Sequence, residues 1–389
     1  MHTPAQDVVR ISLVFCSGVK YQNKSFISSS TANLLSEGCA DRTSHQMAEL
    51  LDFYGIYYDV SVDRDYTVIT MCTLGKFIDK TLEILSDIIL KPLFLKDECE
   101  IYTQKRKSEL KIEREKIDVR SREELARTIF GQSHHYGIFS DADDYDNVTS
   151  EDLRAFYNRF YTRANLFAVV SGNISSQLLD GVKHIVDALP EGVSERVISA
   201  APTAAVQIKR VSCGVAVAVQ SAVNIGRVLF ARTHPDFIAM QVTATLLGGY
   251  FSSRLVKNLR EDHGFTYGIY AAVVNMQDSG YFAISSELKS ECTDDAVEEI
   301  FREIELLREV EPSHEELEMV KRVITGEMLR ILDGPFGIAD VTIENIQNGV
   351  TNRATEEMIE KIDAVTPADV RDMARKYLQR EDLSVVIYS

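Results

Sequence analysis

Basic side chains are scarce in this chain of 389 residues. It has 42 lysines and arginines against 59 aspartates and glutamates, which gives a formal net charge of −17. We therefore expect no nucleic-acid partner, because binding to phosphates needs a basic face. The same charge argues against an anionic membrane surface. Acidity of this kind is more often a solubility feature than a binding signal.

Long apolar runs and clustered cysteines are also lacking. No segment is apolar over the length that crosses a bilayer, so we expect no membrane span. The start of the chain lacks the basic and apolar regions of a signal peptide, and Val8–Phe15 alternates like a strand. None of the six cysteines lies in a CxxC motif, which predicts scattered core thiols and neither a zinc ribbon nor a disulfide scaffold. These features indicate a soluble protein and leave its compartment, cytoplasmic or periplasmic, open.

One segment occurs twice. Residues 148–170 and 365–387 align without a gap at an offset of 217 residues (365 minus 148). A repeat of such long period indicates two copies of one domain, because the repeats of solenoid proteins are far shorter. Thr149 and Thr366 stand at matching positions. Each is predicted to cap a helix, and Pro367 suits the first helical position of the second one.

Both halves follow the same order of predicted elements. A first strand (Val8–Phe15 and Val211–Val219) is followed by two helical segments ending near glycines, two further strands and long amphipathic helices. Strands adjacent in sequence with helices grouped around them predict an α+β fold of two homologous sandwich domains. We place the domains at residues 1–189 and 207–389. The linker, residues 190–206, is rich in Ala, Pro and Ser, and we expect it to let the domains face each other like a clamshell.

The strongest local signal is LLGGYFSSRLVKNLREDHGFTYGIYAAV, residues 246–273. Its order of a glycine pair, an SxRL motif, an arginine and a GlxY-like turn resembles the second domain of the pitrilysin/insulinase-type zinc metallopeptidases. The small two-domain type related to mitochondrial processing peptidase is the most similar. The resemblance covers essentially the whole chain. The residues that carry it are Gly248-Gly249, Ser253-Arg254-Leu255, Arg260, Gly264-Phe265-Thr266-Tyr267, Gly55, Asp65-Tyr66-Thr67 and His134-His135-Tyr136-Gly137.

The resemblance implies a degenerate zinc motif in the first domain. Catalytic members carry HxxEH on a helix, with two histidine ligands and a glutamate that acts as general base. The register set by Gly38 puts Ser29, Ala32 and Asn33 at the His, Glu and His positions. Downstream acidic residues such as Glu109 cannot hold zinc alone, because a catalytic site needs three protein ligands. We therefore predict no metal and no cofactor in this chain, and zinc in a partner subunit.

By the same resemblance, Arg260 and Tyr267 are candidate substrate-binding residues. In the family the equivalent pair holds the substrate carbonyl beside the zinc, and guanidinium and phenol donors suit that role. The alternative is a surface arginine and a sheet tyrosine without a special role. Gly248 and Gly249 are also candidates for substrate binding, with a simple helix-to-turn breaker as their alternative. No GK[ST] follows them, which excludes a P-loop.

The resemblance implies the non-catalytic, peptide-binding subunit of a heterodimeric zinc metallopeptidase. An HxxEH-bearing homologous partner would carry out zinc-assisted hydrolysis, and this chain would complete the active chamber. We expect metalloendopeptidase activity only with that partner. The alternative is a non-enzymatic structural or peptide-binding homologue, and a homodimer in isolation is a further possibility. Asp59 replaces an asparagine that is usual on the family's substrate-binding edge strand, so we do not expect inherited peptide specificity.

Overall fold

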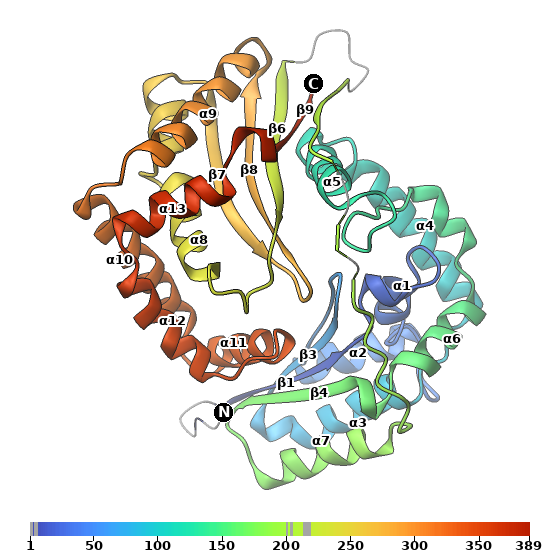
Figure 1. Ribbon diagram of the computed structural model, residues 1–389. Coiled ribbons are helices and arrows are strands. Elements are labelled where there is room, and N and C mark those ends of the chain that lie inside the picture. Colours follow the sequence, from blue (N-terminus) through green and yellow to red (C-terminus); the bar gives the residue numbers. More distant parts are fainter. Residues whose placement is uncertain (1–2, 4–6, 200, 203–204, 213–218) are drawn as a thin grey trace. The chain divides into compact units, whose positions relative to one another are not determined.

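The protein divides into two compact units, each of mixed helix and sheet (Figure 1). This content confirms the predicted α+β class. The structure, a computed structural model, describes residues 3, 7–199, 201–202, 205–212 and 219–389. Unit 1 consists of Met1–Lys111, Ser140–Ile198 and Leu332–Glu344, and unit 2 consists of Ile112–Phe139, Ser199–Ile331 and Asn345–Ser389.

Unit 1 is built on a four-stranded sheet. Its strands are β1 (Val8–Phe15), β2 (Tyr57–Val62), β3 (Thr67–Leu74) and β4 (Leu166–Gly172). Their order in the sheet is β2-β3-β1-β4, and β1 pairs antiparallel with both of its neighbours. The predicted strand Val8–Phe15 is confirmed, and its residues Val9, Ile11 and Leu13 are buried because they point into the core of the unit.

Unit 2 is built on a five-stranded sheet. Its strands are β5 (Ile208–Val211), β6 (Gln220–Leu229), β7 (Thr266–Asn275), β8 (Gly280–Lys289) and β9 (Ser384–Tyr388). Their order is β5-β9-β6-β8-β7, and β6 pairs antiparallel with β8 and β9, as β1 does with β3 and β4. Apart from β5, which runs parallel to β9 at one edge, the two sheets share one topology. The sheets therefore repeat, as the duplicated sequence indicated.

Helices pack on both sheets. In unit 1 they are α1 (Ile27–Asn33), α2 (Ser44–Tyr54), α3 (Ile78–Leu90), α4 (Lys96–Glu113, within the unit up to Lys111), α6 (Ser150–Phe160) and α7 (Ser176–Ala188). In unit 2 they are α5 (Ile117–Phe130), α8 (Phe237–Ala244), the π-helical turns η5 (Thr245–Gly249) and η6 (Val256–Asp262), α9 (Thr293–Glu309), α10 (His314–Ile331), α12 (Arg353–Ala364) and α13 (Pro367–Tyr377). Helix α11 (Pro335–Gln347) belongs to unit 1 up to Glu344. Short 3₁₀ turns complete the chain: η1 (Val19–Tyr21), η2 (Gly75–Phe77), η3 (Ala142–Asn147), η4 (Arg163–Asn165), η7 (Ser290–Cys292) and η8 (Arg380–Asp382).

One helix in each unit comes from the opposite half of the sequence. Helix α5, from the first half, packs in unit 2 on β6 and β9 (Figure 1). There the amide of Asn224 on β6 donates to Ser121 Oγ at 2.8 Å. Helix α11, from the second half, packs in unit 1, where Arg10 of β1 pairs with Asp340 at 2.6 Å between Nη2 and Oδ1. Each helix packs against part of the sheet of its unit.

The exchange is reciprocal under the sequence repeat. Shifted by 217 residues, α5 becomes residues 334–347, which is the range of α11 to within one residue. The compact units therefore do not follow the ranges 1–189 and 207–389. Those boundaries describe the two copies along the chain, and they stay a prediction.

The strand predicted at Val211–Val219 requires a correction. Residues 213–218 of that range lie outside the described residues, and β5 ends at Val211. The equivalent of β1 is β6, which the sequence analysis missed. Asn224 and Gly226 break the apolar alternation of β6, because these positions lie on the face that packs against α5.

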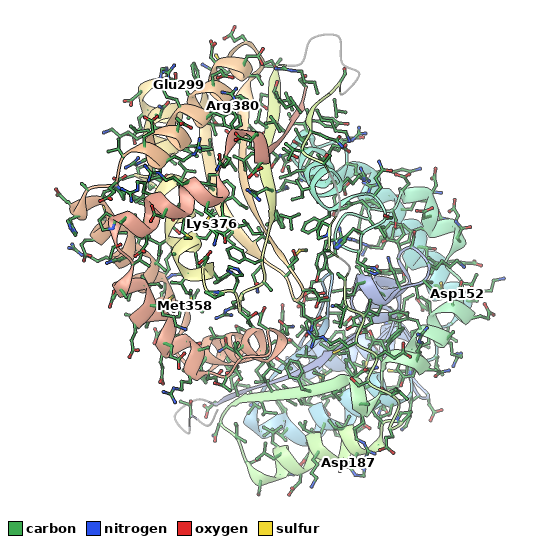
Figure 2. The ribbon with its side chains drawn as sticks, in the orientation of Figure 1. Asp152, Asp187, Glu299, Met358, Lys376 and Arg380 are labelled. Atoms are coloured by element: carbon green, nitrogen blue, oxygen red, sulfur yellow. The ribbon has the colours of Figure 1, made fainter. Side chains whose placement is uncertain are left out.

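The predicted helix caps are confirmed. Thr149 Oγ1 accepts a hydrogen bond from the Asp152 amide at 3.2 Å, and the Asp152 side chain accepts one from the Thr149 amide at 3.2 Å. Asp152 lies at the start of α6 (Figure 2). The same reciprocal box joins Thr366 and Asp369 at the start of α13, with Pro367 in the first turn. The duplicated segment thus forms the same helix start in both units.

Replacing Thr149 or Thr366 by alanine is expected to lower the free energy of unfolding by about 1 kcal/mol, because one helix amide loses its acceptor. Denaturant titration followed by circular dichroism measures this. Thr149→Ser and Thr366→Ser are the controls, since they keep the hydroxyl, and they should stay near the parent value. An equal loss in the serine and alanine variants would show that the methyl group, and not the cap, carries the effect.

Candidate functional site

The positions assigned to the zinc motif lie on helix α1. Ser29 and Asn33 are one turn apart, and the Asn33 side-chain amide donates to the Ser29 carbonyl at 2.8 Å. Ala32 is fully buried between them. This face therefore carries a hydroxyl, a methyl and an amide engaged with the helix backbone, where a zinc site needs imidazole, thiolate or carboxylate ligands. The residues present do not fit zinc, and their assignment to the family motif stays a prediction.

The surroundings of α1 add no other ligand set. Within the described part of the chain, no group of three or more His, Cys, Asp or Glu side chains is placed to hold a metal ion. Cys39 is buried, and burial, with a smaller contribution from Asp87, raises the pKa of its thiol to about 11, so it remains protonated at neutral pH. Glu109 on α4 is paired with Arg106 at 2.6 Å. A carboxylate held by a guanidinium is a poor candidate for a metal ligand.

An aromatic and cationic cluster lies where α1 begins. Phe26, just before the helix, has a left-handed backbone with φ of 64° and stacks on Tyr145 with ring centroids 3.9 Å apart. Burial acts to lower the pKa of Arg106, but hydrogen bonds with Tyr145 and Glu109 outweigh it and raise the pKa. The stacking on Tyr145 offsets the energetic cost of the left-handed backbone at Phe26. The cluster gives unit 1 a permanent cation beside α1.

Tyr267 lies in a bulge of β7. Thr266 pairs with Leu288 and Ile269 pairs with Ser286. Strand β7 therefore advances by three residues between these pairs, whereas β8 advances by two. Thr266 and Ile269 are buried, and the extra residue leaves Tyr267 90% exposed. A bulge of this kind redirects a side chain that regular alternation would place elsewhere.

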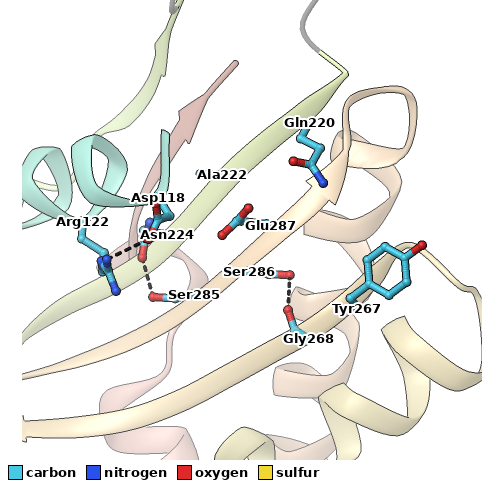
Figure 3. A pocket seen from close by; sticks show the side chains of 10 residues that line it. All are labelled: Asp118, Arg122, Gln220, Ala222, Asn224, Tyr267, Gly268, Ser285, Ser286 and Glu287. Atoms are coloured by element: carbon cyan, nitrogen blue, oxygen red, sulfur yellow. Dashed lines mark hydrogen bonds and ion pairs between the residues drawn. The ribbon is translucent and has the colours of Figure 1, made fainter. Parts of the chain in front are cut away.

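Hydrogen bonds hold this bulge. Thr266 Oγ1 accepts from the Gly268 amide at 3.0 Å and donates to the Glu287 carbonyl at 2.6 Å. Ser286 Oγ donates to the Gly268 carbonyl at 2.9 Å, which Figure 3 shows as a dashed line. Buried hydroxyl groups thus replace the ladder bonds that the bulge interrupts. The hydrogen bonds that hold the bulge therefore also keep Tyr267 exposed.

Beside the bulge, the face of the sheet under the start of α5 is hollowed (Figure 3). We call this the sheet hollow, and its volume is about 430 Å³. Only Tyr267 of its lining was predicted from the sequence, because most of the other lining residues are polar and come from elements far apart in the chain. The lining consists of Asp118 and Arg122 of α5, Gln220, Ala222 and Asn224 of β6, Tyr267 and Gly268 of β7, and Ser285, Ser286 and Glu287 of β8.

Arg260 lies outside this lining. It is exposed on η6, and its guanidinium carbon lies 5.0 Å from the centre of the Phe251 ring. Phe251 is itself 67% exposed, so the pair is an accessible cation–π contact. The structure places Arg260 and Tyr267 in the same unit, each at the surface, and their joint action on a substrate stays a prediction.

Gly248 and Gly249 have a visible packing role. Gly248 is buried on η5, and a β-carbon there would lie 2.7 Å from Ala271 Cβ and 2.8 Å from Ala271 N on β7. At Gly249 a β-carbon would lie 3.1 Å from Thr245 Cβ. Gly248 therefore lets the helical turn approach the strand that carries Tyr267, whereas Gly249 packs within the turn itself. Their role in substrate binding remains a prediction.

Other motif residues also serve the structure. Ser253 and Leu255 are fully buried, and Arg254 Nε and Nη2 donate to the two Glu316 oxygens at 2.7 and 2.8 Å. Burial opposes this charge, but the Glu316 contact raises the pKa of Arg254. In the turn after α5, the Tyr136 amide donates to His134 Nδ1 at 3.1 Å. These contacts give structural roles to the SxRL residues and to His134.

The structure defines an α+β protein with two related sheets, and comparison with known proteins assigns the family. Residues 1–137 match the family model described as "Insulinase (Peptidase family M16)", and residues 147–324 match the one described as "Peptidase M16 inactive domain". The chain belongs to the M16 peptidase family. The predicted family resemblance is therefore confirmed.

Curated relatives extend over nearly the whole chain. An "Uncharacterized zinc protease" of Rickettsia felis is 23% identical over 99% of this chain and 93% of its own length. A "Probable mitochondrial-processing peptidase subunit beta, mitochondrial" of Arabidopsis thaliana is 21% identical over 91% of this chain and 68% of its own length. No helix among the described residues is apolar over enough length to span a bilayer.

Solved structures share the fold. A peptidase M16 inactive domain from Pseudomonas fluorescens has a TM-score of 0.91 and 20% identity, with 100% of this chain and 94% of that chain covered. A protease from Helicobacter pylori has a TM-score of 0.86 and 17% identity, with 100% and 95% covered. At these identities the likeness establishes the fold alone.

Gly248→Ala is expected to lower the free energy of unfolding by about 1–3 kcal/mol, because the new methyl group must displace backbone and side-chain atoms of Ala271. Gly326→Ala on α10 is the control. Nothing lies within 4 Å of a β-carbon there, so helix propensity should leave it neutral or stabilised by up to about 1 kcal/mol. Thermal and denaturant unfolding measure both. Unchanged stability of Gly248→Ala together with lost peptide binding would favour a direct substrate role.

Proposed function

We propose that this protein is a non-catalytic, peptide-binding subunit of a heterodimeric zinc metallopeptidase, and that it completes the active chamber of an HxxEH-bearing homologue. Membership of the M16 family and the match to the inactive-domain model support this function. The Arabidopsis relative, named as a probable processing-peptidase subunit, supports a partner of the same family. This chain has no residue that fits zinc at Ser29, Ala32 and Asn33.

The bulge that exposes Tyr267 carries the proposal. A bulge interrupts the β7–β8 ladder. The buried hydroxyl groups of Thr266 and Ser286 form hydrogen bonds with Gly268 that replace the interrupted backbone bonds. The result is a phenol 90% exposed beside a hollow. A strand that served packing alone would gain stability from regular pairing and from a buried ring.

In the proposed role, this chain binds and orients the peptide. The Tyr267 hydroxyl and the Arg260 guanidinium donate hydrogen bonds to the substrate carbonyl, where negative charge develops during hydrolysis. The partner supplies zinc and activates the water. Strand β2 stands at the edge of the sheet of unit 1 and offers unpaired backbone groups for an extended peptide. Asp59 lies on that strand and adds a negative charge to it.

A second candidate is a structural or peptide-binding homologue without any peptidase partner. The contact of Arg260 with Phe251, together with its position outside the lining of the sheet hollow, favours it. Under this alternative Arg260 and Tyr267 are surface residues, and no change at either affects proteolysis.

The purified chain is expected to contain no stoichiometric zinc and to cleave no peptide. Co-expression with an HxxEH-bearing homologue from the same genome should yield a complex that cleaves peptides. Metal analysis, size-exclusion chromatography and a fluorogenic peptide assay measure these outcomes. About one zinc per chain, removable with loss of activity, would overturn the non-catalytic assignment. Absence of both complex and activity would favour the second candidate.

In an active complex, Tyr267→Phe or Arg260→Ala is expected to slow turnover more than tenfold, since one donor to a developing oxyanion contributes ~10²–10³ in rate. Tyr270→Phe and Arg322→Ala are the matched controls. Tyr270 is exposed on the same strand and Arg322 is exposed on α10, and neither lines the hollow. Steady-state kinetics should show controls near the parent rate. Unchanged turnover in Tyr267→Phe and Arg260→Ala would exclude their proposed role.

A further inference from the structure

The first half of the connection between the two units is held by unit 1. The boundary between the units falls between Ile198 and Ser199, so residues 190–198 of the predicted linker belong to unit 1. We call residues 190–198 the strap. Its residues Glu195 and Val197 are partly buried while their direct neighbours are exposed, which is typical of an extended segment lying on a surface. The Val197 side chain packs against the apolar core of the unit.

Two side chains of unit 1 hold the middle of the strap at Glu195. The Asn165 side chain is buried, its Nδ2 donates to the Phe160 carbonyl at 3.4 Å, and its Oδ1 accepts from the Glu195 backbone amide at 3.2 Å. On α6, Arg159 Nε donates to both carboxylate oxygens of Glu195, at 3.0 and 3.1 Å, and Arg159 Nη2 donates to the second of them. A buried amide needs partners, and this one finds its acceptor bond in the strap.

The start of the strap is also fixed to unit 1. The backbone amides of Arg163 and Ala164 donate to the carbonyls of Pro190 and residue 191, each at 2.9 Å. Gly192 follows with φ of 66°, and a β-carbon there would lie 2.4 Å from Thr162 Cβ. Glycine therefore allows both this backbone conformation and the close approach of the strap to unit 1.

The repeat shows that holding the strap is particular to unit 1. Shifted by 217 residues, Arg159 corresponds to Lys376 and Asn165 corresponds to Asp382. Lys376 of α13, labelled in Figure 2, pairs with Asp236 at 2.6 Å, and Asp382 pairs with an arginine of β6 at 2.8 Å. In unit 2 these positions bind other parts of the same unit. In unit 1 they bind the chain that leaves it.

We propose that the strap is a conformational device that limits how far the two units can move apart. The Ser199 amide donates to Asp278 of unit 2 at 3.2 Å, so four residues (199 minus 195) join this anchor to Glu195. Four extended residues span at most about 14 Å. If the strap is released back to Ala188, where α7 ends, eleven residues (199 minus 188) join the anchors and span about 40 Å. This role goes beyond the proposed function and needs no peptidase partner.

Trypsin cleavage measures how often the strap is released. Arg196 is the only lysine or arginine in residues 190–206, and a cut after it yields fragments 1–196 and 197–389, which mass spectrometry identifies. Arg196 is exposed, but its neighbours must leave their contacts to enter the protease, so the rate follows the released fraction. Cleavage of the full chain should be slower than cleavage of a synthetic peptide of residues 190–206.

Arg159→Ala should raise the rate of cleavage after Arg196 about threefold, the size expected of one exposed ion pair. Lys376→Ala is the matched control and should stay near the parent rate. The two side chains are exposed to 57% and 58%, and each pairs with one acidic residue, but only Arg159 contacts the strap. Added salt should speed cleavage in the parent more than in Arg159→Ala, with rates taken relative to the synthetic peptide.

Gly192→Ala should raise the same rate about tenfold, because a methyl group meets Thr162 and the left-handed backbone disfavours alanine. Gly349→Ala is the control, since it shares the left-handed backbone, with φ of 69°, but nothing lies within 4 Å of its β-carbon. Small-angle X-ray scattering should give a larger radius of gyration for Gly192→Ala than for Gly349→Ala. Circular dichroism checks that both variants are folded.

The possible outcomes test both parts of this proposal. Parent cleavage as fast as that of the synthetic peptide, or equal rates in Arg159→Ala and Lys376→Ala, would show that unit 1 does not hold the strap. Faster cleavage of Gly192→Ala with an unchanged radius of gyration would overturn the limit on movement of the units. None of these results depends on zinc or on a partner, so the proposed function is tested separately.

Discussion

The central strand of each sheet must be covered on both faces, and much of the structure follows from this requirement. In unit 1, β1 is buried over most of its length, and in unit 2, β6 is buried from Ser221 to Gly226. The helices next to each sheet in sequence cover one face. The other face is covered by α11 in unit 1 and by α5 in unit 2. Because α5 stops short of the β7 edge, the polar end of that face remains open as the sheet hollow.

The reciprocal exchange of α5 and α11 has a consequence for stability. Neither half of the sequence contains everything that its own sheet needs. Asn224 of β6 depends on Ser121 of α5, and Arg10 of β1 depends on Asp340 of α11. A buried amide left without its partner costs about 1–3 kcal/mol. The two copies are thus joined by their cores as well as by the connecting chain.

The two copies have diverged in what they offer to a ligand. In unit 1, α1 keeps its helical form, and the positions assigned to the zinc motif carry groups that do not bind zinc. In unit 2, a bulge in β7 exposes one tyrosine, and hydrogen bonds from buried hydroxyl groups stabilise that bulge. Packing explains the glycine pair and Arg254 well. It does not explain why Tyr267 faces an open hollow, which is why the proposed function centres on this residue.

Local information in the sequence was enough for the α+β class, for strand β1, for the helix caps at Thr149 and Thr366, and for the family. Each depends on periodicity, on a cap three residues from its partner, or on a short motif. Strand β6, the exchange of α5 and α11, and the presence of Asp118 and Glu287 in the lining of one hollow depended on the tertiary structure. They join residues more than a hundred positions apart, and no local pattern encodes which distant surface a helix or strand face will contact.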